Sequence, residues 1–326
     1  MNKLTVSSSP HISSKGSVSR IMLDVVIALI PAGIASVYFF GLRTLWVISL
    51  AIISAVLTEA LIQRFTKKPV TINDFSAVVT GLLLAYNLPP TAPWWLPVIG
   101  SFIAIALVKQ VFGGLGSNFM NPALASRAIL LAAWPVHMTT WIIPNVDAVG
   151  TATPLETLDY MTGINTTISG ATEVVSDPLP SLFNSFIGNI GGTIGEISTL
   201  ALLIGAIYLL TRHVISWHIP LTYIATTFIL TSLLSGNGLE GGLYHVILGG
   251  LILGAFYMAT DYSSSPITAK GKIIMGIGCG VMTSVIRLYG GYPEGVSYSI
   301  LLMNIATPLI DKFTRPRTFG EVKRHA

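Results

Sequence analysis

A threonine near the middle of the chain has the neighbours that a covalent attachment site needs. Thr153 lies in the sequence DAVGTATPL, which begins at Asp147, and its neighbours are small enough to leave its hydroxyl accessible. Pro154 restricts the backbone and favours an extended conformation at Thr153. Asp147 could orient a Mg²⁺-bound phosphate reagent toward that hydroxyl. These residues therefore allow Thr153 to accept a phosphoryl group.

The same residues also suit an ordinary helix start. A threonine before proline in a polar loop is commonly a turn residue or an N-cap, and Glu156 occupies the N3 position of a capping box. On residue types alone, capping is the more common interpretation.

Other catalytic chemistries have weaker support in this sequence. The six histidines are scattered, and only His213 and His218 lie close together along the chain. The single cysteine, Cys279, excludes a disulfide framework or a cysteine-ligated cluster held by this chain alone. A serine hydrolase would need a G-x-S-x-G elbow, which the sequence lacks.

The elements that must position Thr153 are apolar and helical. With 326 residues, 52% hydrophobic residues, 10% charged residues and a mean hydropathy of +0.72, the chain is no soluble domain. Apolar windows of the length needed to cross a bilayer precede and follow a polar insert. We therefore predict an all-α polytopic membrane protein with about ten spans, near 21–41, 44–63, 72–90, 93–112, 120–135, 195–211, 217–235, 241–260, 271–289 and 296–311.

The distribution of Lys and Arg predicts the orientation of these spans. With the N-terminus inside, only Arg43 and Arg287 of the 18 basic residues fall on the outer side. Both termini are then cytoplasmic, residues 136–192 lie outside, and residues 1–20 form a polar lead-in without the apolar core of a signal peptide. The net charge of +4 is better explained by Lys and Arg residues retained in cytoplasmic loops than by a nucleic-acid partner. The predicted inner residues are Lys3, Lys15, Arg20, Arg64, Lys67, Lys68, Lys109, Arg127, Arg212, Lys270, Lys272, Lys312, Arg315, Arg317, Lys323 and Arg324.

Two short glycine-containing windows suggest an internal repeat. GLLLA at 81–85 resembles GLILG at 250–254, and Gly113-Gly114 resembles Gly290-Gly291. With five spans per half, such a repeat must be inverted, and paired interrupted spans indicate broken helices at a central site. The alternative is that small residues only let helices pack closely. The predicted domains are a membrane repeat at 1–135, an insert at 136–194, a second repeat at 195–313 and a cytoplasmic tail at 314–326.

The carboxylates near the spans predict local pairing rather than an ion relay. Asp24 follows Arg20 by four residues, and Glu59 precedes Arg64 by five. These acids lie near the inner ends of their windows, away from the membrane centre where an ionisable group is usually functional. This placement counts against a carboxylate relay contained within the chain.

Several longer stretches, spread along nearly the whole chain, carry a resemblance to one known family. They are PVTINDFSAVVTGLLLAYNLPP (69–90), GGLGSNFMNPALASRAIL (113–130), ATPL (152–155), DYSSSPITAKGK (261–272) and RLYGGYPEGVSYSILLMNIATPLID (287–311). Together they resemble the NqrB/RnfD family, which contains the RnfD component of the Rnf electron-transport complex and the NqrB component of the sodium-translocating NADH:quinone reductase. The resemblance implies two inverted five-helix repeats, similar to urea transporters, in a prokaryotic plasma membrane. It also implies electron transfer between ferredoxin and NAD⁺ coupled to Na⁺ or H⁺ movement, by a component that is not catalytic alone.

The resemblance further implies FMN in phosphoester linkage to a threonine outside the membrane. The family pattern Asp-x-x-Ser/Thr-Gly/Ser-Ala-Thr/Ser, followed by Pro-Leu, matches the stretch from Asp147 to Leu155 except that Gly150 and Thr151 stand in inverted order. The rival is Thr172, which ends an intact Ser-Gly-Ala-Thr sequence matching the family pattern but lacks the Asp and the Pro. Thr153 is preferred.

A second, non-covalent flavin, riboflavin or FMN, is also implied by the resemblance. It needs an apolar slot with a few polar groups, for which Asn118 and Asn121 are candidates, with helix capping as an equal alternative. Implied partners are membrane and peripheral subunits, including another covalent flavoprotein and iron–sulfur proteins, but no nucleic acid. The alternative function is a cofactor-free channel or secondary transporter, which would not need the ATPL threonine.

Overall fold

The computed structural model describes residues 17–142, 155, 158, 180–290 and 294–316. All of the regular elements in these ranges are helices, which confirms the predicted all-α class. Each predicted apolar window coincides with one helix or with two or three consecutive helices.

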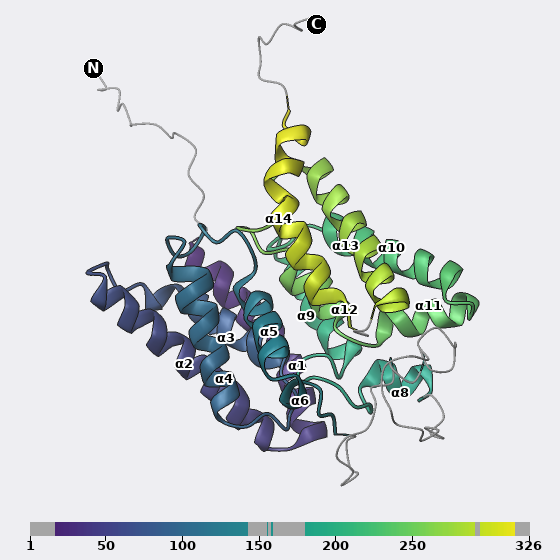
Figure 1. Cartoon of the computed structure of the whole chain (residues 1–326), viewed down its shortest axis with the longest axis horizontal. Helices are drawn as coiled ribbons and strands as arrows, with labels where there is room; N and C mark the ends of the chain where they lie inside the picture. Colours follow the sequence, from purple (N-terminus) through teal and green to yellow (C-terminus); the bar gives the residue numbers. More distant parts are fainter. Residues whose placement is uncertain (1–16, 143–154, 156–157, 159–179, 291–293, 317–326) are drawn as a thin grey trace, which may run out of the picture.

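The helices form two groups that lie side by side (Figure 1). α2 packs against α3 and α4 in the first group, as α10 packs against α11 and α13 in the second, and the groups meet where α1 packs on α9 and α5 on α14. The first group comprises α1 (Val18–Phe40), α2 (Arg43–Phe65), η1 (Ile72–Asp74), α3 (Ser76–Tyr86), α4 (Trp95–Phe102), η2 (Ile103–Gln110), α5 (Pro122–Ala133) and α6 (Pro135–Met138). After α8 (Leu182–Ile187), the second comprises α9 (Thr199–Thr211), α10 (His218–Leu234), α11 (Gly238–Ile247), α12 (Leu251–Leu253), η3 (Gly254–Met258), α13 (Ala269–Tyr289) and α14 (Val296–Thr314).

Local capping explains where several helices begin. Ser17 Oγ accepts a hydrogen bond from the amide of Arg20 at the start of α1, and Thr268 Oγ1 accepts one from Gly271 at the start of α13. Such side chains satisfy backbone donors that have no partner within the helix. α1 ends at Gly41, whose φ of 79° favours glycine.

The lengths of the helices support membrane insertion for part of the predicted spans. Among the described residues, α1, α2 and α13 are long and apolar enough to cross a membrane. A fourth span results if α11 and the helix Leu251–Met258, which bend by 63° at their junction, count as one. Ten crossings remain a prediction, because five further apolar helices have only 10–17 residues.

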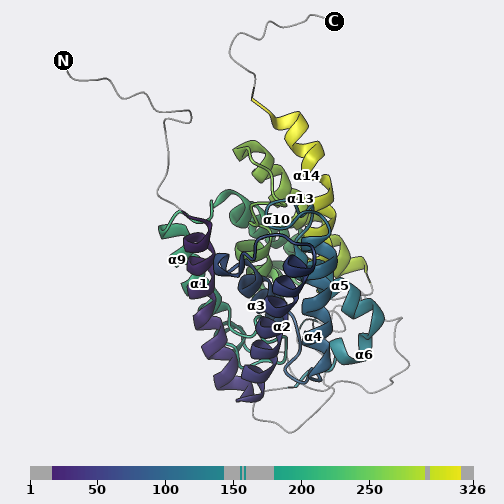
Figure 2. The same cartoon turned by 90° about the vertical axis from the view of Figure 1, so that its left-hand side faces the viewer.

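The direction of the chain is seen by following the ends of the helices (Figures 1 and 2). α1 begins and α14 ends toward one end of the molecule, whereas the turn from α1 to α2 lies toward the other. α6 and α8, which flank the predicted insert, also lie toward that other end (Figure 1).

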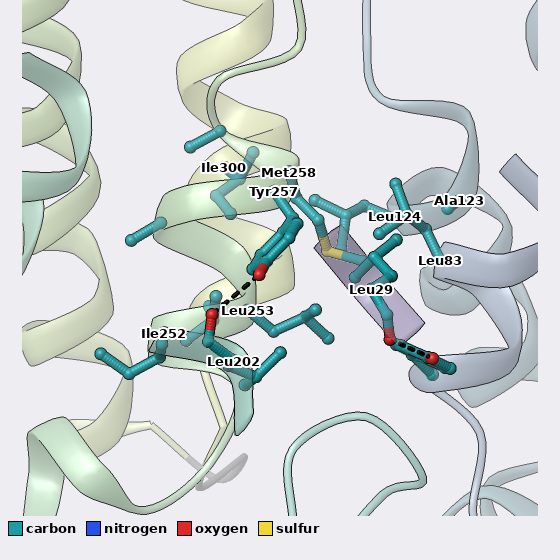
Figure 3. Packing of buried hydrophobic residues seen from close by; sticks show 14 of the residues in the cluster. Leu29, Leu83, Ala123, Leu124, Leu202, Ile252, Leu253, Tyr257, Met258 and Ile300 are labelled. Carbon is teal, nitrogen blue, oxygen red and sulfur yellow. Dashed lines mark hydrogen bonds between the residues drawn. The ribbon is translucent and has the colours of Figure 1, made fainter. Parts of the chain in front are cut away.

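The apolar core lies where the two groups meet. Figure 3 shows Met258 of η3 directed toward Leu83 and Leu124 of the first group. The Tyr257 hydroxyl donates to the Leu202 carbonyl at 2.8 Å, and the Tyr86 hydroxyl donates to the Leu29 carbonyl at 2.7 Å. These bonds satisfy buried hydroxyls while tying α3 to α1 and η3 to α9, as polar side chains do between membrane helices.

The crossing of α1 and α9 depends on a small residue. A Cβ atom at Gly205 would overlap the carbonyl oxygen of Ala28 and the Tyr257 hydroxyl. Helices in a membrane gain packing energy from such close approach, since lipid is as apolar as their own side chains.

Candidate functional site

A large cavity lies between the two groups, toward the end where α1 begins. It has a volume of about 90 Å³, and the surrounding space between atoms, part of it open to solvent, is about 770 Å³. Its walls come mainly from α1, α3, η2, α5, α9 and η3, and are mostly apolar. Its polar lining residues are Ser76, Thr80, Lys109, Asn118, Asn121, Thr260, Asp261 and Ser263.

The structure brings both predicted asparagines to this cavity but gives them different roles. Asn121 Oδ1 accepts hydrogen bonds from the amides of Ala123 and Leu124, so Asn121 is the N-cap of α5. Asn118 Nδ2 donates to the Met120 carbonyl at 3.2 Å and lies 3.5 Å from an oxygen of Asp261. The capping alternative is therefore confirmed for Asn121.

Lys109, on the wall of the cavity, belongs to a closed buried ion pair. Its Nζ lies 2.8 and 3.0 Å from the carboxylate oxygens of Glu59 and 2.6 Å from Ser76 Oγ. Gln110 Nε2 donates to the same Glu59 at 2.8 Å. Because three acceptors use the three ammonium protons, Lys109 has no donor left for a ligand.

The π-helix η2 helps explain how consecutive residues reach Glu59. In a regular helix, neighbours point about 100° apart, whereas a π-helical turn is wider and changes the direction of its side chains. Lys109 and Gln110 close this segment, and both are buried.

The predicted local ion pairs were wrong. Glu59 pairs with Lys109 and not with Arg64. Asp24 accepts a hydrogen bond from the Tyr208 hydroxyl at 2.9 Å and lies 3.4 Å from Arg212, so it joins α1 to α9 rather than pairing with Arg20. Each acid has an inward position on its helix, whereas Arg20 and Arg64 are exposed to the surroundings.

A second group of charged side chains was missed by sequence reasoning. We call Arg127, Glu196, Arg287 and Glu294 the charged cluster. Arg127 on α5 forms an ion pair with Glu294 and donates to Ser297, so it links the two groups of helices. Only 4% of Arg127 is exposed. Its predicted place in a cytoplasmic loop was therefore wrong. A simple count of basic residues does not distinguish a buried arginine within a helix from an arginine in a loop.

Arg287 stabilises the bend between α11 and α12. Its guanidinium donates to the carbonyls of His245, Leu248 and Glu294, the first two lying at the C-terminal end of α11. A cation is favourable at that end because unpaired carbonyls give it negative potential. Gly249, with φ 71°, lets the backbone pass close to the guanidinium.

Glu196 lies at the other side of the same bend. Its carboxylate faces Gly250, the residue preceding α12, where a Cβ atom would overlap one of its oxygens. The charged side chains of Arg287 and Glu196 thus lie at the break that was predicted to form part of a central site.

A small cavity of about 20 Å³ adjoins this bend. Glu196, Glu294 and Gly249 contribute to its walls together with Leu155. A volume of this size has room for about one water molecule. The remaining walls are Ile190, Gly191, Gly192, Ile197 and Leu248.

The predicted flavin attachment residues lie outside the described part of the chain. These are Thr153, its motif residue Asp147 and the rival Thr172. Leu155, the last residue of ATPL, is described and is only 2% exposed. It belongs to a small apolar core with Ile190, Ile197 and Leu248. The small cavity is therefore adjacent to the end of the predicted attachment motif.

Comparison with known proteins gives one consistent family. A model of the NQR2, RnfD, RnfE family matches residues 5–320. The chain is 56% identical over 323 residues to the D component of the Na⁺-translocating ferredoxin:NAD⁺ oxidoreductase complex of Acetobacterium woodii, covering 98% of this chain and 96% of that one. It is 48% identical over 328 residues to the proton-translocating counterpart of Clostridium ljungdahlii, covering 98% and 97%. The D component of an ion-translocating oxidoreductase complex of Aliivibrio salmonicida is 38% identical over 357 residues, covering 98% and 99%. The chain therefore belongs to the NQR2, RnfD, RnfE family.

Proposed function

We propose that this chain is the membrane-embedded D component of a complex that passes electrons between ferredoxin and NAD⁺ and uses them to translocate an ion. The observation that carries this function is the full-length similarity to the D components of such complexes, at 56% and 48% identity. The partners are the other membrane and peripheral subunits, including a second covalent flavoprotein and iron–sulfur proteins. The chain works only within that assembly.

The two groups of helices are inverted five-helix repeats of a urea-transporter-like fold in a prokaryotic plasma membrane. Supporting this, α2 and α10 pack on equivalent neighbours, and Tyr86 and Tyr257 bond equivalent first helices. Both termini are cytoplasmic and residues 136–192 lie outside. In support, α1 begins and α14 ends toward one end of the molecule, opposite α6 and α8 (Figure 1).

Thr153 carries FMN through a phosphoester bond. The support is the match of Asp147 and of the ATPL sequence to the family's attachment pattern, together with the buried Leu155 that ties this motif to the second group of helices. When bound, the flavin supplies one- and two-electron redox chemistry, and the protein's part is to position it.

A second, non-covalent flavin binds at the mouth of the large cavity, with one edge inside. The cavity offers apolar walls and an amide at Asn118, but about 90 Å³ is below the roughly 300–1,000 Å³ of pockets that enclose a drug-sized ligand. Most of the ring therefore lies outside the cavity. Asn118→Ala should lower the amount of flavin released by acid precipitation, whereas Thr80→Ala, on another wall, should keep it.

Fluorescence of the denatured chain on a gel tests the covalent flavin. Thr153→Ala should abolish the fluorescent band, because the hydroxyl is the only lost atom that can form the phosphoester. The stability should change by no more than about 1 kcal/mol, even if a helix cap is lost. Thr172→Ala is the matched control and should stay fluorescent, and mass spectrometry of the 136–192 peptide should locate the mass of FMN.

Two outcomes would contradict this assignment. A fluorescent Thr153→Ala band beside a dark Thr172→Ala band moves the site to Thr172. A dark wild-type band supports the alternative, a cofactor-free channel or transporter.

A further inference from the structure

We propose that Glu196 and Glu294 bind a small monovalent cation, a proton or Na⁺, in the small cavity beside Leu155. The physiological role of this site rests on the proposed function, since it would serve the translocation carried out by the complex. The binding itself is a property of this chain's buried groups and can be measured separately.

The main observation is a buried carboxylate that faces the cavity without a basic side chain in contact. Glu196 is 6% exposed and lines the cavity. Among the described residues, no Lys, Arg or His nitrogen lies within 4.0 Å of its oxygens. Burying a charge in this way is costly unless something compensates it. A carboxylate kept under these conditions within a membrane protein is a functional candidate.

The two nearby arginines are engaged elsewhere. Arg127 is bonded to Glu294 and Ser297, and Arg287 donates to three backbone carbonyls. Both act on Glu196 electrostatically from beyond 4.0 Å.

The space before Glu196 is suited to a single small cation. The cavity of about 20 Å³ holds one water molecule or an ion of similar size. Glu294 contributes a second carboxylate to the lining, and the buried Thr193 hydroxyl interacts with the Glu196 carboxylate. Carboxylate and hydroxyl oxygens are hard ligands of the kind that such cations take.

The charge balance of the cluster predicts that the cation binds weakly while the proposed flavin is oxidised. The charged cluster has two positive and two negative side chains, so a bound cation leaves one excess positive charge. In the described part of the chain, three other titratable side chains interact with the cluster, His245 and Tyr223 with Arg287 and Tyr298 with Arg127, and none of them alters this balance while neutral. An electron arriving on a group beside Leu155 would offset the excess charge. Cation binding should therefore tighten when the proposed flavin is reduced.

Infrared difference spectroscopy of the purified complex tests the site directly. A proton ligand should produce a carboxylic acid band on acidification at constant salt. Na⁺ should instead shift a carboxylate band when it replaces a large cation at constant pH. Glu196→Gln should remove the signal, whereas Glu240→Gln, the matched control at an exposed acid on α11, should keep it.

A second variant keeps the test decisive if Glu196→Gln does not assemble. Gly250→Ala retains the carboxylate but places a methyl group against its oxygen. The apparent cation affinity should fall by about tenfold, as when a group that orients a ligand is lost. A wild-type complex without either band change, or a Glu196→Gln complex that retains the signal, overturns the proposal. Failure of the proposed function would show separately, as a wild-type complex that does not reduce NAD⁺ with ferredoxin.

Discussion

The two buried groups of charges in this protein are built in opposite ways. Glu59 and Lys109, 1% and 2% exposed, share two contacts of 2.8 and 3.0 Å, and Ser76 and Gln110 bond the remaining polar atoms. In the charged cluster, Arg127 and Glu294 are paired, but Glu196 has no basic nitrogen within 4.0 Å among the described residues.

This difference in bonding distinguishes a structural ion pair, Glu59–Lys109, from a carboxylate, Glu196, that is able to exchange its partner. A buried pair compensates its desolvation only when geometry and hydrogen bonds are nearly complete. The Glu59–Lys109 pair meets this condition and holds α2, η2 and α3 together. Glu196 does not meet it and adjoins a cavity instead. Burial alone therefore does not identify a functional charge, whereas burial with unused bonding capacity does.

The largest loss of stability is expected on breaking the Glu59–Lys109 ion pair. Glu59→Gln leaves the Lys109 ammonium buried without its counter-charge and should lower the free energy of unfolding by about 3–5 kcal/mol. Thermal unfolding of the purified chain in detergent measures this loss. The double variant Glu59→Gln/Lys109→Met should recover much of it, because no uncompensated charge remains. A single variant as stable as wild type would show that Lys109 is not held by Glu59.

A smaller loss of stability is expected when Arg287, at the bend between α11 and α12, is replaced. Arg287→Met removes donors to three carbonyls and should cost about 2–3 kcal/mol, because hydrogen bonds from charged groups are worth more than neutral ones. Amide hydrogen exchange should increase locally at 245–250. Arg287→Lys should restore little, since an ammonium lacks the planar fork that reaches separate acceptors. Unchanged exchange in Arg287→Met would show that the bend holds without it.

Much of the helical architecture could be predicted from sequence. Each apolar window falls on a helix, because length and apolar composition are local properties. The break in the eighth window was also indicated by glycines, and Gly249 indeed has a positive φ. The Gly pairs are less alike than they look: Gly113 and Gly114 have positive φ, but Gly290 does not.

The partners of the charges could not be predicted, because they come from distant parts of the chain. Glu59 lies five residues from Arg64 but pairs with Lys109, 50 residues away. Asp24 lies 188 residues from its partner Arg212. Glu196 lies at the start of the predicted window 195–211, where a Glu among Gly and Thr gave no local sign of burial. The placement of Arg287 inside the window 271–289, seven residues before Glu294, was the available signal for the charged cluster.

The smallest loss of stability is expected at the exposed ion pair between Arg212 and Asp24. Arg212 is 48% exposed, and its single contact with Asp24 is 3.4 Å long. Exposed pairs of this kind contribute about 0–1 kcal/mol and are screened by salt. Arg212→Gln should therefore change the unfolding free energy by less than about 1 kcal/mol, and that change should vanish at high salt. Asp24 keeps its 2.9 Å bond from Tyr208, so α1 and α9 should stay together. A loss as large as that of Glu59→Gln, persisting in high salt, would show that exposure does not distinguish these pairs.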